Sequence, residues 1–122
     1  MNKIAVIFFA TLLIFFGVNA YAQINEETKI EYLIGSVEKA PEGTKFIRNG
    51  KEYSGEKAAE HLRTKYKRGK KYADTAELFI ENIASKSSVT GIEYSIKFPD
   101  GKTVTTREFF TSELEKIEKD AR

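Results

Sequence analysis

The stretch that decides the fold is IEYSIKFPDGKTVT, residues 92–105. Its first half alternates apolar and polar side chains, with apolar residues at positions 92, 94, 96 and 98. A period of two is typical of a β-strand that buries one face. The PDG triplet at 99–101 favours a turn. Residues 102–105 are therefore expected to return as the partner strand of a hairpin.

A second hairpin is predicted upstream, in FIRNGKEY at residues 46–53. Asn49 and Gly50 lie between two short apolar flanks. Both residue types tolerate the positive φ of a type I′ turn, which makes this pair the strongest short signal for a hairpin.

Apolar residues three and four positions apart flank both hairpins, and this spacing predicts four helices. The first helix starts at Asn25 and is ended by Pro41 and Gly43; the others run from after Ser54 to about Arg68, from about Thr75 to Ser85, and from near Thr106 onward. The order α-β-β-α-α-β-β-α predicts an α+β domain with antiparallel β-hairpins and helices packed on one face.

Polar residues at the predicted helix starts support these assignments. Asn25 is a good N-cap for the first helix. Asp74 is expected to cap the third helix, with Glu77 three residues later completing a capping box. Thr105 and Glu108 form a second possible capping box at the last helix.

Residues 1–22 are predicted to be a signal peptide, followed by one small domain over residues 23–122. Lys3 precedes an apolar run over 4–16, and Ala20-Tyr21-Ala22 has the small-x-small pattern of a cleavage site. Cleavage is expected before Gln23, with cleavage before Tyr21 left open. The alternative is an uncleaved anchor, but the apolar run is shorter than the ~20 residues that span a bilayer. No stable membrane insertion is expected after cleavage.

Composition excludes several classes of protein. The 122 residues include 20 Lys and Arg, 18 Asp and Glu, one His and no Cys, for a net charge of +2. Without Cys there is no disulfide scaffold, thiol nucleophile or Cys-based metal site, and one His excludes a two- or three-His zinc site. The small net charge argues against a nucleic-acid partner. We predict no cofactor and no metal.

The basic run over residues 57–71 is a candidate anion site. In a helix, His61, Lys65 and Arg68 flank one side of the apolar stripe, whereas Arg63, Lys67 and Lys70 flank the other. The alternative is a solvated helix face whose charge is compensated by acids elsewhere, such as Glu113, Glu115 and Glu118.

Two further features carry possible chemistry. His61 could act as a general base, with Ser87 or Ser88 as nucleophile and Glu77 or Asp74 orienting the imidazole. The link over residues 85–91, SKSSVTG, could offer hydroxyls and backbone amides to a ligand, or could simply end a helix. Tyr94 alternates with core residues and is expected to be core.

Four segments occur in an order that resembles a known family: FIRNG at 46–50, A-x-HLR-x-K at 59–65, DTAE-x-FI at 74–80 and IASKSS-x-TG-x-x-Y at 83–94. The string is similar to the YfeK-like family of small exported bacterial proteins, over roughly residues 26–118. The resemblance implies a periplasmic protein of unknown function and supplies no catalytic residues. It does mark polar side chains that could converge on a site or form a buried polar network. Asn49 also has an ordinary role in its turn.

The sequence therefore predicts a non-enzymatic module in the periplasm, or a secreted one if the organism has no outer membrane. Its expected partner is an anionic envelope component or a periplasmic protein. The alternatives are a small hydrolase that uses His61 with a nearby Ser, and a structural or stress accessory protein with no ligand. The candidate binding residues are Arg48, Asn49, His61, Lys65, Arg68, Glu77, Ser87 and Ser88.

Overall fold

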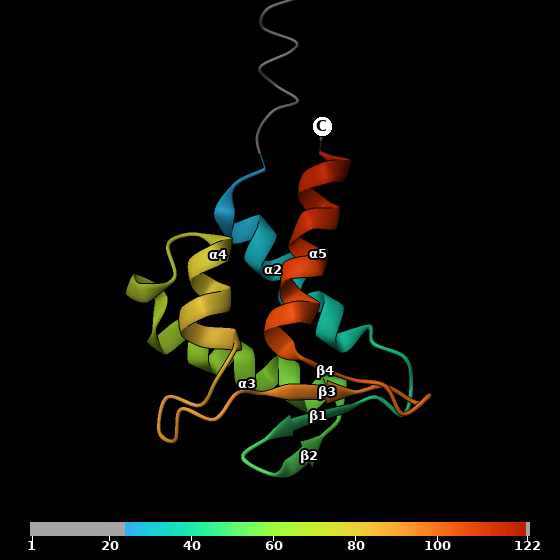
Figure 1. Ribbon diagram of the computed structural model, residues 1–122. Coiled ribbons are helices and arrows are strands. Elements are labelled where there is room, and N and C mark those ends of the chain that lie inside the picture. Colours follow the sequence, from blue (N-terminus) through green and yellow to red (C-terminus); the bar gives the residue numbers. More distant parts are fainter. Residues whose placement is uncertain (1–23, 122) are drawn as a thin grey trace, which may run out of the picture.

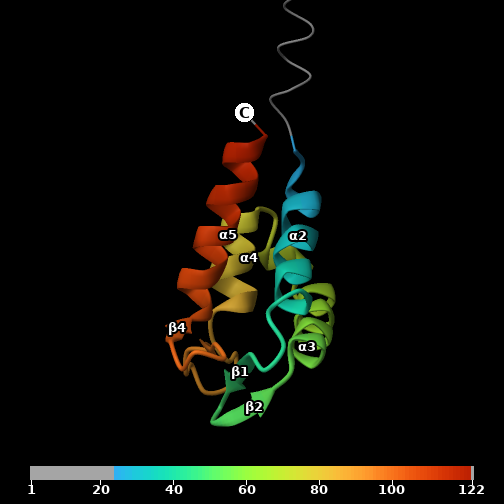
Figure 2. The ribbon, with the colours of Figure 1, turned by 90° about the vertical axis from the view of Figure 1, so that its right-hand side faces the viewer.

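The computed structural model describes residues 24–121, in which helices stand on one face of a four-stranded antiparallel sheet (Figures 1 and 2). The α+β class and the predicted order of elements are confirmed. The helices are α2 (Glu26–Glu38), α3 (Gly55–Arg68), α4 (Ala76–Phe79) and α5 (Thr106–Asp120). The strands are β1 (Lys45–Arg48), β2 (Lys51–Tyr53), β3 (Ser95–Lys97) and β4 (Thr103–Thr105).

The predicted signal peptide and its cleavage site lie outside the described residues. Within residues 24–121, no helix is long and apolar enough to cross a membrane.

The two predicted hairpins join into one sheet of strand order β2-β1-β3-β4. β1 and β3 are its central pair, with Phe46 opposite Ile96. The predicted tight turn between β1 and β2 is confirmed, because Asn49 and Gly50 have φ of 51° and 78°. This pairing brings the β1–β2 turn beside the segment that leads into β3.

The strand expected over residues 92–98 is shorter than its alternating pattern predicts. Only residues 95–97 form β3, and Ile92 is 56% exposed rather than core. Ile92 instead closes a loop: its carbonyl accepts the Ser87 amide at 3.0 Å, and its own amide donates to the Thr90 hydroxyl at 3.2 Å. The loop's hydrogen bonds replace those of a longer strand.

The apolar stripes of the helices meet above the sheet in one core. All four apolar residues of the α2 stripe are buried, and Phe79 of α4 packs edge-on against both Tyr66 and Phe110 at centroid distances of 5.6 and 6.2 Å. At the start of α3, Gly55 lies against the carbonyl oxygen of Val37 so closely that a Cβ would overlap it. Gly55 therefore fixes the close approach of α3 to the end of α2.

The third predicted helix differs from the expectation in two ways. Its cap is Thr75, whose hydroxyl accepts the Leu78 amide at 3.1 Å, so the capping box of Asp74 and Glu77 is wrong. After one α-helical turn, residues 80–84 widen into a π-helical turn. The buried Ser85 hydroxyl donates to the Ile80 carbonyl at 2.5 Å and so spans the wider turn.

The Asn25 cap is confirmed, since its side chain accepts the Thr28 amide at 2.8 Å. The Thr105 hydroxyl accepts the Glu108 amide at 3.1 Å, but among the hydrogen bonds of residues 24–121 none returns from the Glu108 side chain to Thr105, so the cap forms without the capping box. Thr106 adds a tertiary bond, since its hydroxyl donates to the Ala84 carbonyl at 2.8 Å. The end of the π turn is thereby tied to the start of α5.

Candidate functional site

A cleft of about 600 Å³ lies where α3, the β1–β2 turn and the loop before β3 meet. Seven of the eight predicted site residues line it: Arg48, Asn49, His61, Lys65, Arg68, Ser87 and Ser88. Glu77 does not, because it lies on an exposed face of α4. The β1–β3 pairing brings the β1–β2 turn beside the loop before β3, and α3 contacts β1, so three segments distant in sequence meet at the cleft.

The two flanks of α3 differ in charge compensation. On one flank, Arg63 pairs with Glu31 and Glu38, and Lys70 pairs with Glu27 at 2.8 Å. These acids come from α2, so the expected compensation by Glu113, Glu115 and Glu118 is wrong. The basic residues of the other flank face the cleft.

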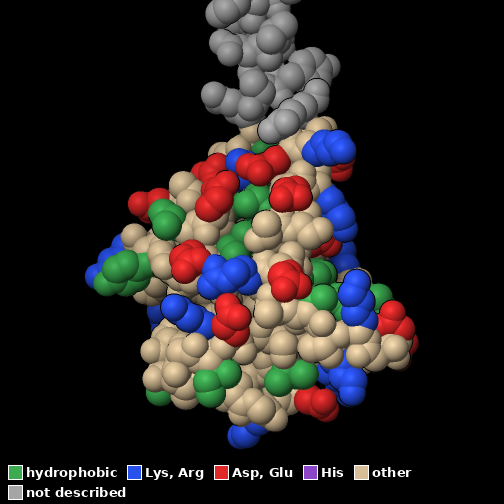
Figure 3. Space-filling view, in the orientation of Figure 1, with side chains coloured by type: hydrophobic (Ala, Val, Ile, Leu, Met, Phe, Trp, Pro, Cys, Tyr) green, Lys and Arg blue, Asp and Glu red, His purple; other side chains and the backbone are tan. Residues whose placement is uncertain are grey.

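No carboxylate neutralises the cleft. Within residues 24–121, no Asp or Glu oxygen lies within 4.0 Å of the charged nitrogens of Arg48, Lys65 or Arg68. By contrast, basic and acidic side chains interleave over α4 and α5 (Figure 3). Arg107, near the start of α5, pairs with both Glu81 and Glu93. The cleft is therefore a local concentration of unpaired positive charge.

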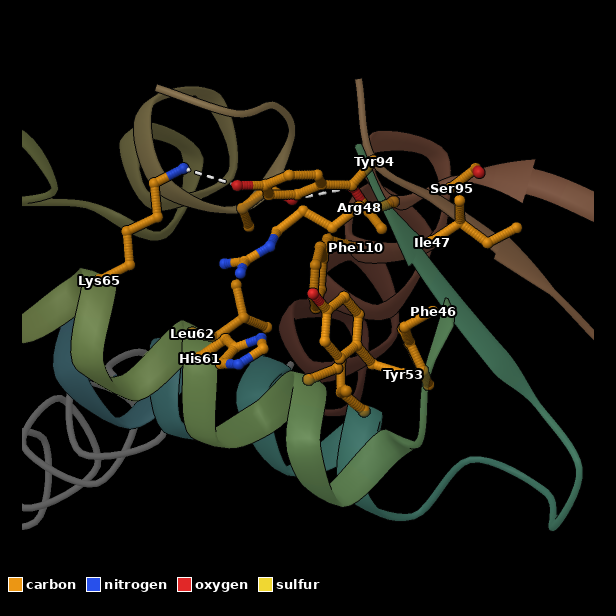
Figure 4. Close-up of a pocket in the computed structure, with 14 residues that line it drawn as sticks. Phe46, Ile47, Arg48, Tyr53, His61, Leu62, Lys65, Tyr94, Ser95 and Phe110 are labelled. Atoms are coloured by element: carbon orange, nitrogen blue, oxygen red, sulfur yellow. Dashed lines mark hydrogen bonds between the residues drawn. The ribbon is translucent and has the colours of Figure 1, made fainter. Parts of the chain in front are cut away.

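Lys65 is held in place at the cleft wall. Its Nζ donates to the Lys86 carbonyl at 2.8 Å and to the Tyr94 hydroxyl at 3.2 Å, the latter drawn in Figure 4. The same ammonium lies 5.1 Å from the centroid of the Tyr94 ring. An ammonium has three donors, so these two bonds leave one N–H for a ligand.

Arg48 ends β1 and extends between Tyr94 and His61 (Figure 4). Its guanidinium carbon lies 5.4 Å from the centroid of the Tyr53 ring, a cation–π distance. Among the side-chain hydrogen bonds of residues 24–121, none uses any of the five N–H donors of this guanidinium. Those donors are free to bind an anion in the fork geometry that suits carboxylate and phosphate.

The Ser/Thr-rich link over residues 85–91 both ends a helix and borders the cleft, the two alternatives that the sequence left open. Ser85 ends the π turn, whereas residues 87–91 form a loop that borders the cleft. The Ser87 hydroxyl organises this loop by accepting the amides of Val89 and Thr90, each at 3.2 Å. Asn49 fastens the loop to the β1–β2 turn: its Oδ1 accepts the Thr90 hydroxyl at 2.8 Å and its Nδ2 donates to Ser87 at 3.4 Å.

His61 is half-buried at the edge of the cleft, with its ring edge-on to Tyr53 at a centroid distance of 4.8 Å. Burial and the nearby cations Arg48 and Lys57 lower the pKa of His61 below 6.5, which favours the neutral imidazole. Among the hydrogen bonds of residues 24–121, none joins this imidazole to a serine hydroxyl or a carboxylate. The geometry thus gives the hydrolase alternative no Ser–His pair.

Comparison with known proteins identifies the chain's family. The model of a family of unknown function, DUF5329, matches residues 24–118. The chain belongs to this family. Uncharacterized protein YfeK of Salmonella typhimurium is 39% identical to this chain over 77 residues, and the match covers 62% of this chain and 63% of that protein. The match thus spans less than two thirds of its relative, and no solved structure matches. The predicted YfeK-like resemblance is confirmed.

Sequence reasoning on this DUF5329 chain missed several residues that line the cleft. Tyr94 is buried as expected, but its hydroxyl also faces Lys65 and forms part of the wall. An aromatic residue with a polar tip at a core position is the signal that could have indicated this. Three other lining residues lie within the predicted segments 57–71 and 85–91, namely Thr64, Gly69 and Val89. No sequence signal marks the three that lie outside both segments, namely Tyr72, Asn82 and Ile83.

Proposed function

We propose that this protein is a non-enzymatic module that binds an anionic group of an envelope component or partner protein in the cleft beside α3. The observation that carries the proposal is the grouping of Arg48, Lys65 and Arg68 around one cleft without a carboxylate among the described residues. Like charges in a concave site focus their field and attract counter-ions. Charge-assisted hydrogen bonds from these residues would then hold phosphate or carboxylate.

The proposed location is the periplasm, or the exterior of a cell without an outer membrane. Support comes from the signal-peptide pattern of residues 1–22, with its short apolar run and its Ala-x-Ala ending. Mass spectrometry of the protein purified after expression of the full chain tests this directly. A mass beginning at Gln23 supports export, and an intact N-terminus argues against it.

The binding proposal is tested by mapping amide chemical shifts against anionic probes at low and high salt. The probes are lipopolysaccharide fragments, anionic lipid head groups and peptidoglycan fragments. Shifts should cluster on residues 57–71 and 87–91 and should weaken with salt, because exposed charges are screened over ~10 Å at 0.1 M.

A charge-matched pair of variants makes the test specific. Arg48→Gln with Arg68→Gln removes two free cations and leaves the structural bonds of Lys65 intact. The control, Lys67→Gln with Lys102→Gln, removes the same charge at exposed positions outside the cleft. The cleft variant should bind a probe more than tenfold more weakly, since each charge-assisted bond contributes about 1.5–3 kcal/mol. Equal binding by both variants would mean that the cleft is not the site.

A further inference from the structure

A second, smaller cavity opens beside the cationic cleft. It has a volume of about 50 Å³ and lies between α3, β1 and α5. Its lining is mainly apolar and includes Ala58. The apolar lining residues Phe46, Leu62 and Phe110 are labelled in Figure 4. The charged residues of its lining, Arg48 and Lys65, also face the cleft, and the rest of the lining suits an apolar group.

The cavity and the cleft share their boundary. Arg48, His61, Lys65 and Tyr94 line both. In Figure 4 the Arg48 side chain lies above the apolar pocket, with the Lys65–Tyr94 pair at one side. A ligand atom that contacts these cations therefore lies next to an opening into apolar space.

This arrangement specifies more than the sign of the ligand's charge. An anion alone would fill only the cleft, and would leave an apolar cavity in which water lacks its usual polar partners. A group attached to the anion could displace that water and gain the free energy of apolar burial. A volume of about 50 Å³ favours a short apolar group over a long acyl chain.

We infer that the ligand is a small organic anion that carries a short, branched apolar group. Its carboxylate or phosphate would bind Arg48 and Lys65, and its apolar group would enter the pocket lined by Phe46, Leu62 and Phe110. This inference rests on the proposed anion site and adds the class of ligand to it.

The test compares simple anions by NMR titration of the protein purified after expression of the full chain. Inorganic phosphate and acetate probe the anion site alone, isovalerate adds a branched group, and octanoate adds a chain that is too long. A buried methylene strengthens binding by about fourfold. Isovalerate should therefore bind at least tenfold more tightly than acetate, and octanoate should bind no better than isovalerate.

Ala58→Leu places extra carbon atoms in the pocket from a helical position that leucine favours. This variant should bind acetate as the native protein does and should lose the gain shown by isovalerate. Thr111→Leu adds similar volume at an exposed position of α5 and should lose nothing.

The outcomes separate the two proposals. If acetate and phosphate bind but isovalerate binds no better, the inferred ligand class is wrong and the anion site stands. If no anion shifts the cleft residues, the proposed function fails as well. Should Ala58→Leu not fold, the native protein still decides: a further tenfold gain with octanoate would overturn the size limit set by the pocket.

Discussion

Replacing Asn49 separates two roles that the structure gives this residue. In the β1–β2 turn it has a φ of 51°, and the left-handed conformation costs a residue with an ordinary Cβ about 1–2 kcal/mol. Asn49 also joins this turn to the 87–91 loop through two contacts that we call the latch: it accepts the Thr90 hydroxyl at 2.8 Å and contacts the Ser87 hydroxyl at 3.4 Å. The shorter bond contributes about 1 kcal/mol, and the longer contact, at the limit of hydrogen-bond geometry, contributes less.

Asn49→Ala removes the latch and retains a strained turn, so the free energy of unfolding should fall by about 2 kcal/mol. Asn49→Gly removes the latch but suits the turn, and should cost about 1 kcal/mol. Because 1 kcal/mol shifts the Tm of a domain this small by roughly 4–8 °C, calorimetry should rank native protein above Gly and Gly above Ala.

Hydrogen exchange of the Thr90 and Ile92 amides, which both bond within the loop, reports the latch itself. Exchange should accelerate in both Asn49 variants, since each frees the loop from the β1–β2 turn. An Asn49→Gly protein with native Tm and native protection of these amides would refute the latch. Asn49 would then shape only its own turn.

Three further outcomes follow from particular contacts. Gly55→Ala should destabilise the protein by more than about 1 kcal/mol, because its Cβ would overlap an α2 carbonyl. Gly35→Ala has open space around it in α2 and should stabilise the protein by about 0.5–1 kcal/mol. Urea unfolding measures both changes. Ser85→Ala should cost about 1–3 kcal/mol in the same assay, since it removes the hydroxyl partner of a buried π-turn carbonyl. NMR of the His61 C2 proton should give a pKa below 6.5, and this pKa should rise in Arg48→Gln. The unfolded chain protonates His61 more readily than the folded protein does. The free energy of unfolding should therefore decrease as the pH falls through 6.5 toward the folded-state pKa.

The features that could be predicted from the sequence depend on local bonds. The turn at Asn49 and Gly50 follows from the backbone preferences of two adjacent residues. The caps at Asn25 and Thr105 each use a bond to an amide three residues on. The buried stripe of α2 follows from helical spacing alone. Each signal lies within a few residues of the structure that it specifies.

The features that sequence reasoning missed depend on distant partners. The π turn at residues 80–84 ends at Ala84, whose carbonyl is bonded by Thr106 from 22 residues away. β3 is short because the preceding loop bonds to itself and to Asn49, 41 residues from Thr90. Glu77 was grouped with the site because it occurs in a family-like segment, but the helix places it on a face away from the cleft. Contacts between residues so far apart in the sequence cannot be read from local sequence patterns.

The charge of the cleft shows why the same limit applies to function. Both flanks of α3 carry lysines and arginines, so composition cannot tell a solvated helix face from a binding surface. Packing decides: α2 presents Glu27, Glu31 and Glu38 to one flank, where they pair with Arg63 and Lys70. The other flank faces FIRNGK at 46–51 and SKSSVTGI at 85–92, two segments that contain no Asp or Glu. The cleft is positive because the sheet places two segments without acidic residues against α3. An acidic residue introduced into either segment should therefore offset this positive charge. Ser88 is exposed at the cleft, and Ser88→Glu should weaken anion binding as strongly as the loss of one cleft cation does. Titration with an anionic probe measures this loss, and Thr111→Glu, at an exposed position outside the cleft, is the control.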